Sequence, residues 1–110
     1  MCTLLILFRP KNKWPLIIGG NRDEMMDRKW LPPSKHWNNS IIGGKDVVAG
    51  GTWLGINENG IVATILNRTN SLGFDTKLSR GNLVIDILKN KDMNKALNYL
   101  SSLDPVNWKP

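Results

Sequence analysis

Apolar residues near the start of the chain form two short runs separated by a polar loop. The first run, Thr3 to Phe8, is rich in leucine and isoleucine, which is typical of a strand buried on both faces. The second run covers Leu16 to Ile18, and the segment between the runs, Arg9 to Pro15, has the length of a hairpin loop. We therefore predict an antiparallel pair of strands, the second of which ends at Gly19-Gly20.

A second hairpin is predicted in the middle of the chain. The segments Thr52 to Asn57 and Ile61 to Asn67 flank Asn59-Gly60, a pair that tolerates the positive φ of a tight primed turn. The preceding stretch, Met25 to Lys45, mixes prolines, tryptophans and asparagines without a clear period. We expect irregular structure there, packed on the core through its tryptophans.

The apolar period becomes helical in the last third of the chain. After a polar loop at residues 70–75, one helix is predicted between Asn82 and Lys89 with Ser79 as its cap. A second helix is predicted from Met93 to Leu103, with Asp92 as its cap. Strands followed by helices indicate a single α+β domain with helices on one face of an antiparallel sheet.

Composition and charge narrow the range of partners. The 110 residues carry a formal charge of +6, but the basic residues are spread along the chain and no nucleic-acid-binding signature accompanies them, so we expect no nucleic-acid partner. The single cysteine favours a reduced, cytoplasmic compartment. No apolar stretch reaches the length of a membrane span, and neither metal-ligand spacing nor a phosphate-binding loop is present, so we expect no metal and no cofactor.

Cys2 is the first residue that could carry chemistry. Removal of Met1 ahead of a small second residue would place a thiol and a free α-amine on the same residue, and both groups titrate close to neutral pH. The amine can then accept the proton that the thiol loses on attack, which supplies the base that a nucleophile requires. The alternative is that Cys2 packs as a small hydrophobic residue at the start of a strand.

Asn21-Arg22-Asp23-Glu24 follows the second predicted strand and should lie beside the start of the first. Asp23 could hold the ammonium of Cys2, while Arg22 could raise the thiolate population or clamp a substrate anion. A solvated turn held by its own side chains is the structural alternative.

Two further candidate site residues, Asn67 and Trp53, belong to the predicted middle hairpin. The Asn67 amide could donate a hydrogen bond to a developing oxyanion, although strand-ending turns are the commoner use of asparagine. Trp53 could form a pocket wall, and a core tryptophan is its alternative. The candidate catalytic residues are thus Cys2, Asp23 and Asn67, and the candidate substrate-binding residues are Asn21, Arg22 and Trp53.

Several separate motifs together resemble the NRDE family, the group of the transport and Golgi organisation protein 2 homologues. They are, in order, Met1-Cys2-Thr3, Gly20-Asn21-Arg22-Asp23-Glu24, Gly51-Thr52-Trp53-Leu54-Gly55-Ile56-Asn57, Gly60, Asn67-Arg68-Thr69 and Ser79-Arg80-Gly81. This family is similar to N-terminal-nucleophile hydrolases, whose cysteine-led chains cut non-peptide amide bonds. The resemblance implies a four-layer αββα sandwich with Cys2 as nucleophile, Asp23 as its orienting partner and Asn67 as oxyanion donor.

The resemblance also implies limits and alternatives. In the hydrolases the arginine precedes the aspartate by three positions, where this chain has Gly20, so the arginine role does not carry over directly to Arg22. Family members are longer, so the chain corresponds to the N-terminal half of such a domain. The function implied is amide hydrolysis at an N-terminal cysteine. The alternatives are non-catalytic handling of a hydrophobic anion such as haem or acyl-CoA, and a truncated, inactive remnant.

Overall fold

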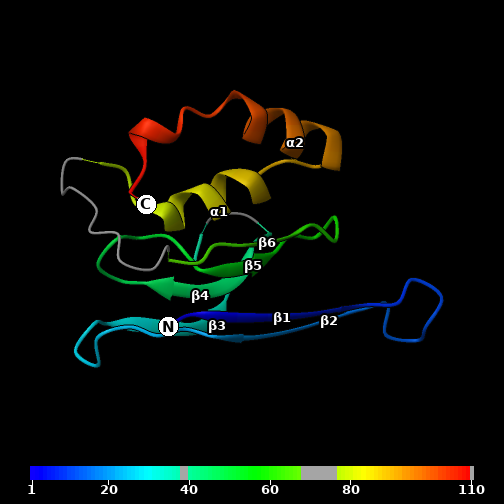
Figure 1. Cartoon of the computed structure of the whole chain (residues 1–110), viewed down its shortest axis with the longest axis horizontal. Coiled ribbons are helices and arrows are strands. Elements are labelled where there is room, and N and C mark those ends of the chain that lie inside the picture. The colour runs from blue at the N-terminus through cyan, green and yellow to red at the C-terminus, as the bar shows by residue number, and fades with distance from the viewer. Residues whose placement is uncertain (38–39, 68–76, 110) are drawn as a thin grey trace.

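The computed structural model describes residues 1–37, 40–67 and 77–109. In these ranges, six strands are followed by two α-helices and a short 3-10 helix, which confirms the predicted α+β class with antiparallel strands before helices (Figure 1). The strands form a two-stranded sheet, β1-β2, and a four-stranded sheet, β3-β4-β5-β6, in which all neighbours are antiparallel. The predicted polar loop at residues 70–75 lies outside the described residues.

Strands β1 (Thr3–Phe8) and β2 (Leu16–Asn21) form the predicted first hairpin. Their register pairs Thr3 with Asn21 and Phe8 with Leu16. The second strand continues through Gly19 and Gly20 instead of ending there. Because of this register, the residues that follow Asn21 lie beside the first residues of the chain.

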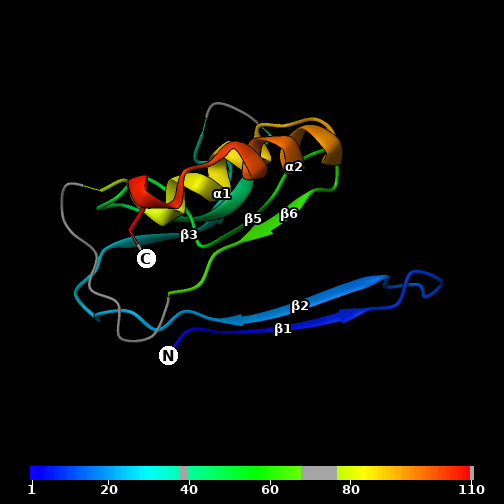
Figure 2. The same ribbon diagram turned by 45° about the horizontal axis from the view of Figure 1, so that its top comes forward.

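The expectation that β1 is buried on both faces is wrong for the described chain. Leu5 is 71% exposed and Phe8 is 68% exposed. The cause lies in the packing, since β1 pairs with β2 alone and the hairpin runs as a separate layer along one side of the molecule (Figures 1 and 2). A large apolar surface therefore faces outward from this hairpin.

The expectation of irregular structure over Met25–Lys45 is wrong where two strands lie in this stretch, whereas the expected packing of a tryptophan on the core is confirmed for Trp37. This stretch contains β3 (Trp30–Ser34) and the start of β4 (Ile42–Asp46), which pair with an irregular register between Leu31 and Ser34. Strand β3 contains two prolines, which strands tolerate at a sheet edge because the missing N–H groups need no ladder partner there. Because these strands contain two prolines and two glycines, their sequences lack the alternation of apolar and polar residues that predicts a strand.

The second predicted hairpin is present, with shorter strands, as β5 (Leu54–Ile56) and β6 (Val62–Thr64). Gly60 adopts φ +79° in the turn, a conformation that glycine reaches without strain. The buried Asn57 amide accepts from the backbone N–H groups of Asn59 and Ile61. The turn is thereby closed by both backbone conformation and a side chain.

Both predicted helices are present, as α1 (Arg80–Leu88) and α2 (Met93–Ser102). Ser79 occupies the N-cap of α1, although its side chain makes no cap hydrogen bond. Asp92 caps α2 by accepting from Lys95 N at 2.9 Å, as predicted. A 3-10 helix, η1 (Pro105–Asn107), follows α2.

The core lies between α1 and the four-stranded sheet. Its buried apolar residues come from the sheet region and from one face of α1: Ile41, Ile61, Ala63, Val84, Ile85 and Leu88. The layers therefore run from helices, through the four-stranded sheet, to the β1-β2 hairpin (Figure 2). This order is compatible with part of an αββα sandwich.

Candidate functional site

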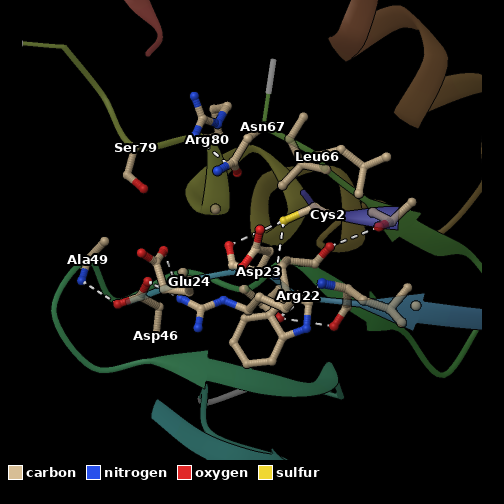
Figure 3. Close-up of a pocket in the computed structure, with 18 of the residues that line it drawn as sticks. Cys2, Arg22, Asp23, Glu24, Asp46, Ala49, Leu66, Asn67, Ser79 and Arg80 are labelled. Carbon is tan, nitrogen blue, oxygen red and sulfur yellow. Dashed lines mark hydrogen bonds and ion pairs between the residues drawn. The ribbon is translucent and has the colours of Figure 1, made fainter. Parts of the chain in front are cut away.

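A pocket of about 500 Å³ opens between the start of the hairpin, the edge of the four-stranded sheet and the start of α1 (Figure 3). All six residues singled out from the sequence line it. They are Cys2, Asn21, Arg22, Asp23, Trp53 and Asn67. Residues far apart in the chain thus meet at one site, as the hairpin register predicted for the first four.

Cys2 contacts Asp23 through the backbone of the aspartate. The thiol donates to Asp23 O at 3.6 Å and accepts from Asp23 N at 3.3 Å. The Asp23 carboxylate meanwhile binds the N-terminal ammonium, which belongs to Met1 in this structure. Asn21 Nδ2 donates to Met1 O at 3.5 Å, so Asn21 and Asp23 together fasten the first residues to the end of β2.

Arg22 is held by charge and by an aromatic ring. Its Nη2 lies 3.3 Å from Glu24 Oε2 and 3.2 Å from Asp46 Oδ2. Its guanidinium carbon lies 4.5 Å from the Trp53 ring centroid, which is the geometry of a cation–π contact. The pairing connects the hairpin to both β4 and the segment before β5, and it compensates the arginine charge with two carboxylates.

Asp46 organises this cluster, and the sequence did not single it out. Its Oδ2 accepts from Arg28 Nε at 2.8 Å as well as from Arg22, and its Oδ1 accepts from the backbone N–H groups of Val48 and Ala49. Partial burial raises the pKa of Asp46, but the Arg28 hydrogen bond and charge and the two backbone donors outweigh it, so the pKa lies below its ordinary value. No local pattern links residues this far apart in the chain.

The wall opposite Cys2 carries Asn67 and Arg80 (Figure 3). Arg80 Nη2 donates to Asn67 Oδ1 at 3.3 Å. Because an arginine can only donate, the amide oxygen of Asn67 must face Arg80, which leaves the Nδ2 donors pointing elsewhere. Among the described residues no hydrogen-bond partner is found for this Nδ2.

A close backbone approach brings α1 to the pocket. Thr52 N donates to Gly81 O at 3.1 Å, and a Cβ on Gly51 would lie 2.3 Å from the carbonyl carbon of Gly81. Only glycine fits at Gly51 without moving the start of the helix. The glycines at 51 and 81 therefore set where Ser79 and Arg80 stand on the pocket wall.

Neither a metal-binding cluster nor a membrane-spanning helix is found among the described residues. They contain no group of three or more His, Cys, Asp and Glu side chains that could hold a metal ion. None of the helices in the described ranges is long and apolar enough to cross a bilayer.

These features define an α+β protein in which a cysteine and an aspartate on one hairpin face a pocket closed by the N-terminus of a helix. The chain belongs to the family described as Transport and Golgi organisation 2, which matches residues 1–106. It is 36% identical to a mouse Transport and Golgi organization 2 homolog over 115 aligned residues and 34% identical to a bovine homolog over 112. Each alignment covers 94% of this chain and 40% of the relative.

A human Transport and Golgi organization protein 2 homolog is 40% identical over 79 residues, which cover 61% of this chain and 27% of the relative. The chain therefore spans about two fifths of the length of the mouse and bovine relatives. No solved structure matches it. These matches establish the family to which the chain belongs.

Proposed function

We propose that this chain is a Transport and Golgi organisation 2 family protein whose Cys2, exposed by loss of Met1, attacks non-peptide amide bonds. The observation that supports the proposal is the position of Asp23, whose backbone contacts the Cys2 sulfur while its carboxylate binds the ammonium of Met1, the residue directly before Cys2. After loss of Met1, the same carboxylate would bind the amine of Cys2, and an N-terminal cysteine mechanism requires this amine to lie beside the thiol.

The proposed reaction has two steps. The terminal amine accepts the thiol proton, and the sulfur adds to the amide carbon to give a tetrahedral intermediate whose oxyanion accepts from Asn67 Nδ2. The carbon–nitrogen bond breaks, the amine leaves with the proton, and an acyl thioester forms on Cys2. Water then cleaves the thioester, releasing the acid and restoring the thiol.

Intact-mass spectrometry of the full chain tests the proposal. We expect loss of Met1, and an added acyl mass when the protein is incubated with fluorogenic N-acyl amides of graded chain length. The added mass should be absent from Cys2→Ala, in which the small second residue still permits removal of Met1. Retention of Met1 would rule out the mechanism, because an internal peptide nitrogen is not basic.

The Asp23→Asn variant tests the carboxylate's contact with the terminal ammonium separately from the reactivity of the Cys2 thiol. This variant keeps the thiol and the backbone contacts to Cys2 but weakens the hold on the ammonium, so acylation should slow while alkylation of Cys2 by iodoacetamide continues. Equal acylation rates in Asp23→Asn and the unmodified protein would contradict the role assigned to the carboxylate.

A second candidate function is non-catalytic binding of a hydrophobic anion such as haem or an acyl-CoA. It is favoured by the apolar surface of the hairpin, where Leu5, Ile6 and Phe8 are each more than half exposed, and by the net charge of +6. Titration with haem and with acyl-CoA should then quench tryptophan fluorescence saturably. Quenching that does not saturate, or that detergent abolishes, would count against this function.

A further inference from the structure

The charges around the pocket are unevenly compensated. The described lining contains four cationic side chains, those of Arg22, Arg28, Arg80 and Lys109, and three acidic ones, those of Asp23, Glu24 and Asp46. Two of the acids pair with the same two arginines, and the third binds the N-terminal ammonium. The acidic side of the pocket is therefore fully engaged without Arg80.

Arg80 differs from Arg22 and Arg28, the other arginines of the described lining, in the kind of partner it has. Arg22 and Arg28 each lie within 4 Å of two carboxylates, whereas the partner of Arg80 is the neutral oxygen of Asn67. Within the described residues, no carboxylate lies within ion-pair distance of Arg80. Its charge consequently remains available to a ligand in the pocket, where a planar guanidinium can bind a carboxylate or a phosphate through two N–H groups.

The position of Arg80 reinforces this charge. It is the first residue of α1, and the Ser79 hydroxyl makes no cap hydrogen bond to the first turn. The positive end of the helix dipole therefore points toward the same wall as the guanidinium. Arg80 and Asn67 face Cys2 across the pocket, so a molecule reacting at the sulfur can reach both (Figure 3).

We infer that Arg80 is a specificity-determining residue that binds an anionic group, a carboxylate or a phosphate, on the substrate that reacts at Cys2. The inference rests on the proposed function for the reacting bond and adds the class of substrate, an acyl compound carrying a negative charge. The hydrogen bond to Asn67 gives Arg80 a second effect, because it turns the Nδ2 donors of the amide away from the guanidinium and leaves them available to a ligand.

The single cysteine permits a test that needs no turnover. Iodoacetate and iodoacetamide are similar in size and alkylate the same thiolate, so the ratio of their rates cancels any change in thiolate population. The anionic reagent should be favoured by Arg80, and in Arg80→Gln the rate ratio of iodoacetate to iodoacetamide should fall about fivefold, as expected for one partly screened charge pair. Arg80→Lys should retain most of the preference.

Lys11→Gln is the matched control, since Lys11 lies in the exposed loop between β1 and β2 and its loss lowers the net charge by the same amount. An unchanged ratio in Arg80→Gln, or an equal fall in Lys11→Gln, would overturn the inference. Intact mass after each reaction gives both rates. Because neither removal of Met1 nor hydrolysis enters this measurement, its failure is distinguishable from failure of the proposed reaction.

Protection of the unsubstituted protein provides a second readout that does not depend on a variant folding. Propionate and inorganic phosphate should each slow alkylation by iodoacetamide more than neutral propionamide does, and the stronger of the two identifies the anion. If neither anion protects Cys2 better than propionamide does, the assignment of Arg80 is wrong.

Discussion

The guanidinium of Arg22 lies over the ring of Trp53, with 4.5 Å between the guanidinium carbon and the ring centroid. Arg22 directly follows β2, whereas Trp53 directly precedes β5, so this contact joins the hairpin to the four-stranded sheet. The same guanidinium also pairs with the carboxylates of Glu24 and Asp46. Arg22 thus links the hairpin to the four-stranded sheet through two partners, Trp53 and Asp46.

A double-mutant cycle should reveal coupling between Arg22 and Trp53. Arg22→Lys keeps the charge but loses the planar contact, and with Trp53→Leu we expect a coupling free energy of about 0.5–1 kcal/mol in chemical denaturation. Arg9→Lys, in the exposed loop after β1, should show no coupling to Trp53→Leu. Additive effects of Arg22→Lys and Trp53→Leu would contradict the stacked geometry.

Asp46 should make stability depend on pH in the acid range. Its folded-state pKa is depressed, so its stabilisation is fully present above the unfolded-state pKa of about 3.9 and is lost as the pH falls through the folded-state value. The free energy of unfolding of Asp46→Asn should therefore be lower than that of the unsubstituted protein near neutrality and should approach it in acid. Asp27→Asn, which removes a carboxylate without an ion pair in the described chain, should give a difference that does not vary in this way.

Gly51→Ala tests the close approach that positions α1. The new Cβ would lie 2.3 Å from a backbone atom of Gly81, so the start of the helix must move, at a cost of about 1–3 kcal/mol. Gly19→Ala is the control, since nothing lies within 4 Å of a Cβ there. Thermal unfolding measures both, and the preference of Cys2 for iodoacetate should fall in Gly51→Ala alone because Arg80 moves with the helix.

Asn57 should contribute much more to the free energy of unfolding than an exposed asparagine does. Its Nδ2 donates to Leu88 O and Asn90 O at 2.9 Å each, satisfying carbonyls at the end of α1 while its Oδ1 closes the β5-β6 turn. Asn57→Ala leaves these buried groups without partners, so we expect a loss of about 2–4 kcal/mol by urea unfolding. Asn94→Ala, at an exposed position of α2, should change stability by less than about 0.5 kcal/mol.

Replacing a leucine by alanine should cost much more stability in the core than on the hairpin. Leu88 is 2% exposed in the core and Leu5 is 71% exposed on the hairpin. Leu88→Ala should cost about 2–5 kcal/mol, whereas Leu5→Ala should stay within about 0.5 kcal/mol in urea unfolding. A large loss for Leu5→Ala would mean that the outer face of the hairpin is covered in solution.

The sequence predicted those parts of the fold that depend on local signals. Asn59-Gly60 and the cap at Asp92 mark a turn and a helix start through the backbone conformations they favour, and both are confirmed. The strands β3 and β4 were missed because their prolines and glycines oppose strand propensity, and pairing with neighbours overrides that preference.

In the candidate site, too, the sequence predicted what local signals determine and missed the contacts between distant segments. Cys2 and Asp23 could be placed together because a short hairpin fixes their proximity through its register. The partnership of Arg22 with Asp46, and that of Asn67 with Arg80, spans segments whose separation no periodic pattern encodes. Such contacts are set by how the layers pack, so the sequence could name Arg22 and Asn67 as site residues but not Asp46 and Arg80 as their partners.

The hairpin packs only weakly against the other described strands and helices. An isolated pair of strands is only marginally stable, and β1 and β2 bury little of their apolar surface. Among the described strands and helices, amide hydrogen exchange should therefore be fastest in this hairpin and slowest in α1, which supplies half of the buried cluster. Cys2 would then sit on a unit that opens while the rest stays folded, and reactivity could be lost with no change in the global melting temperature.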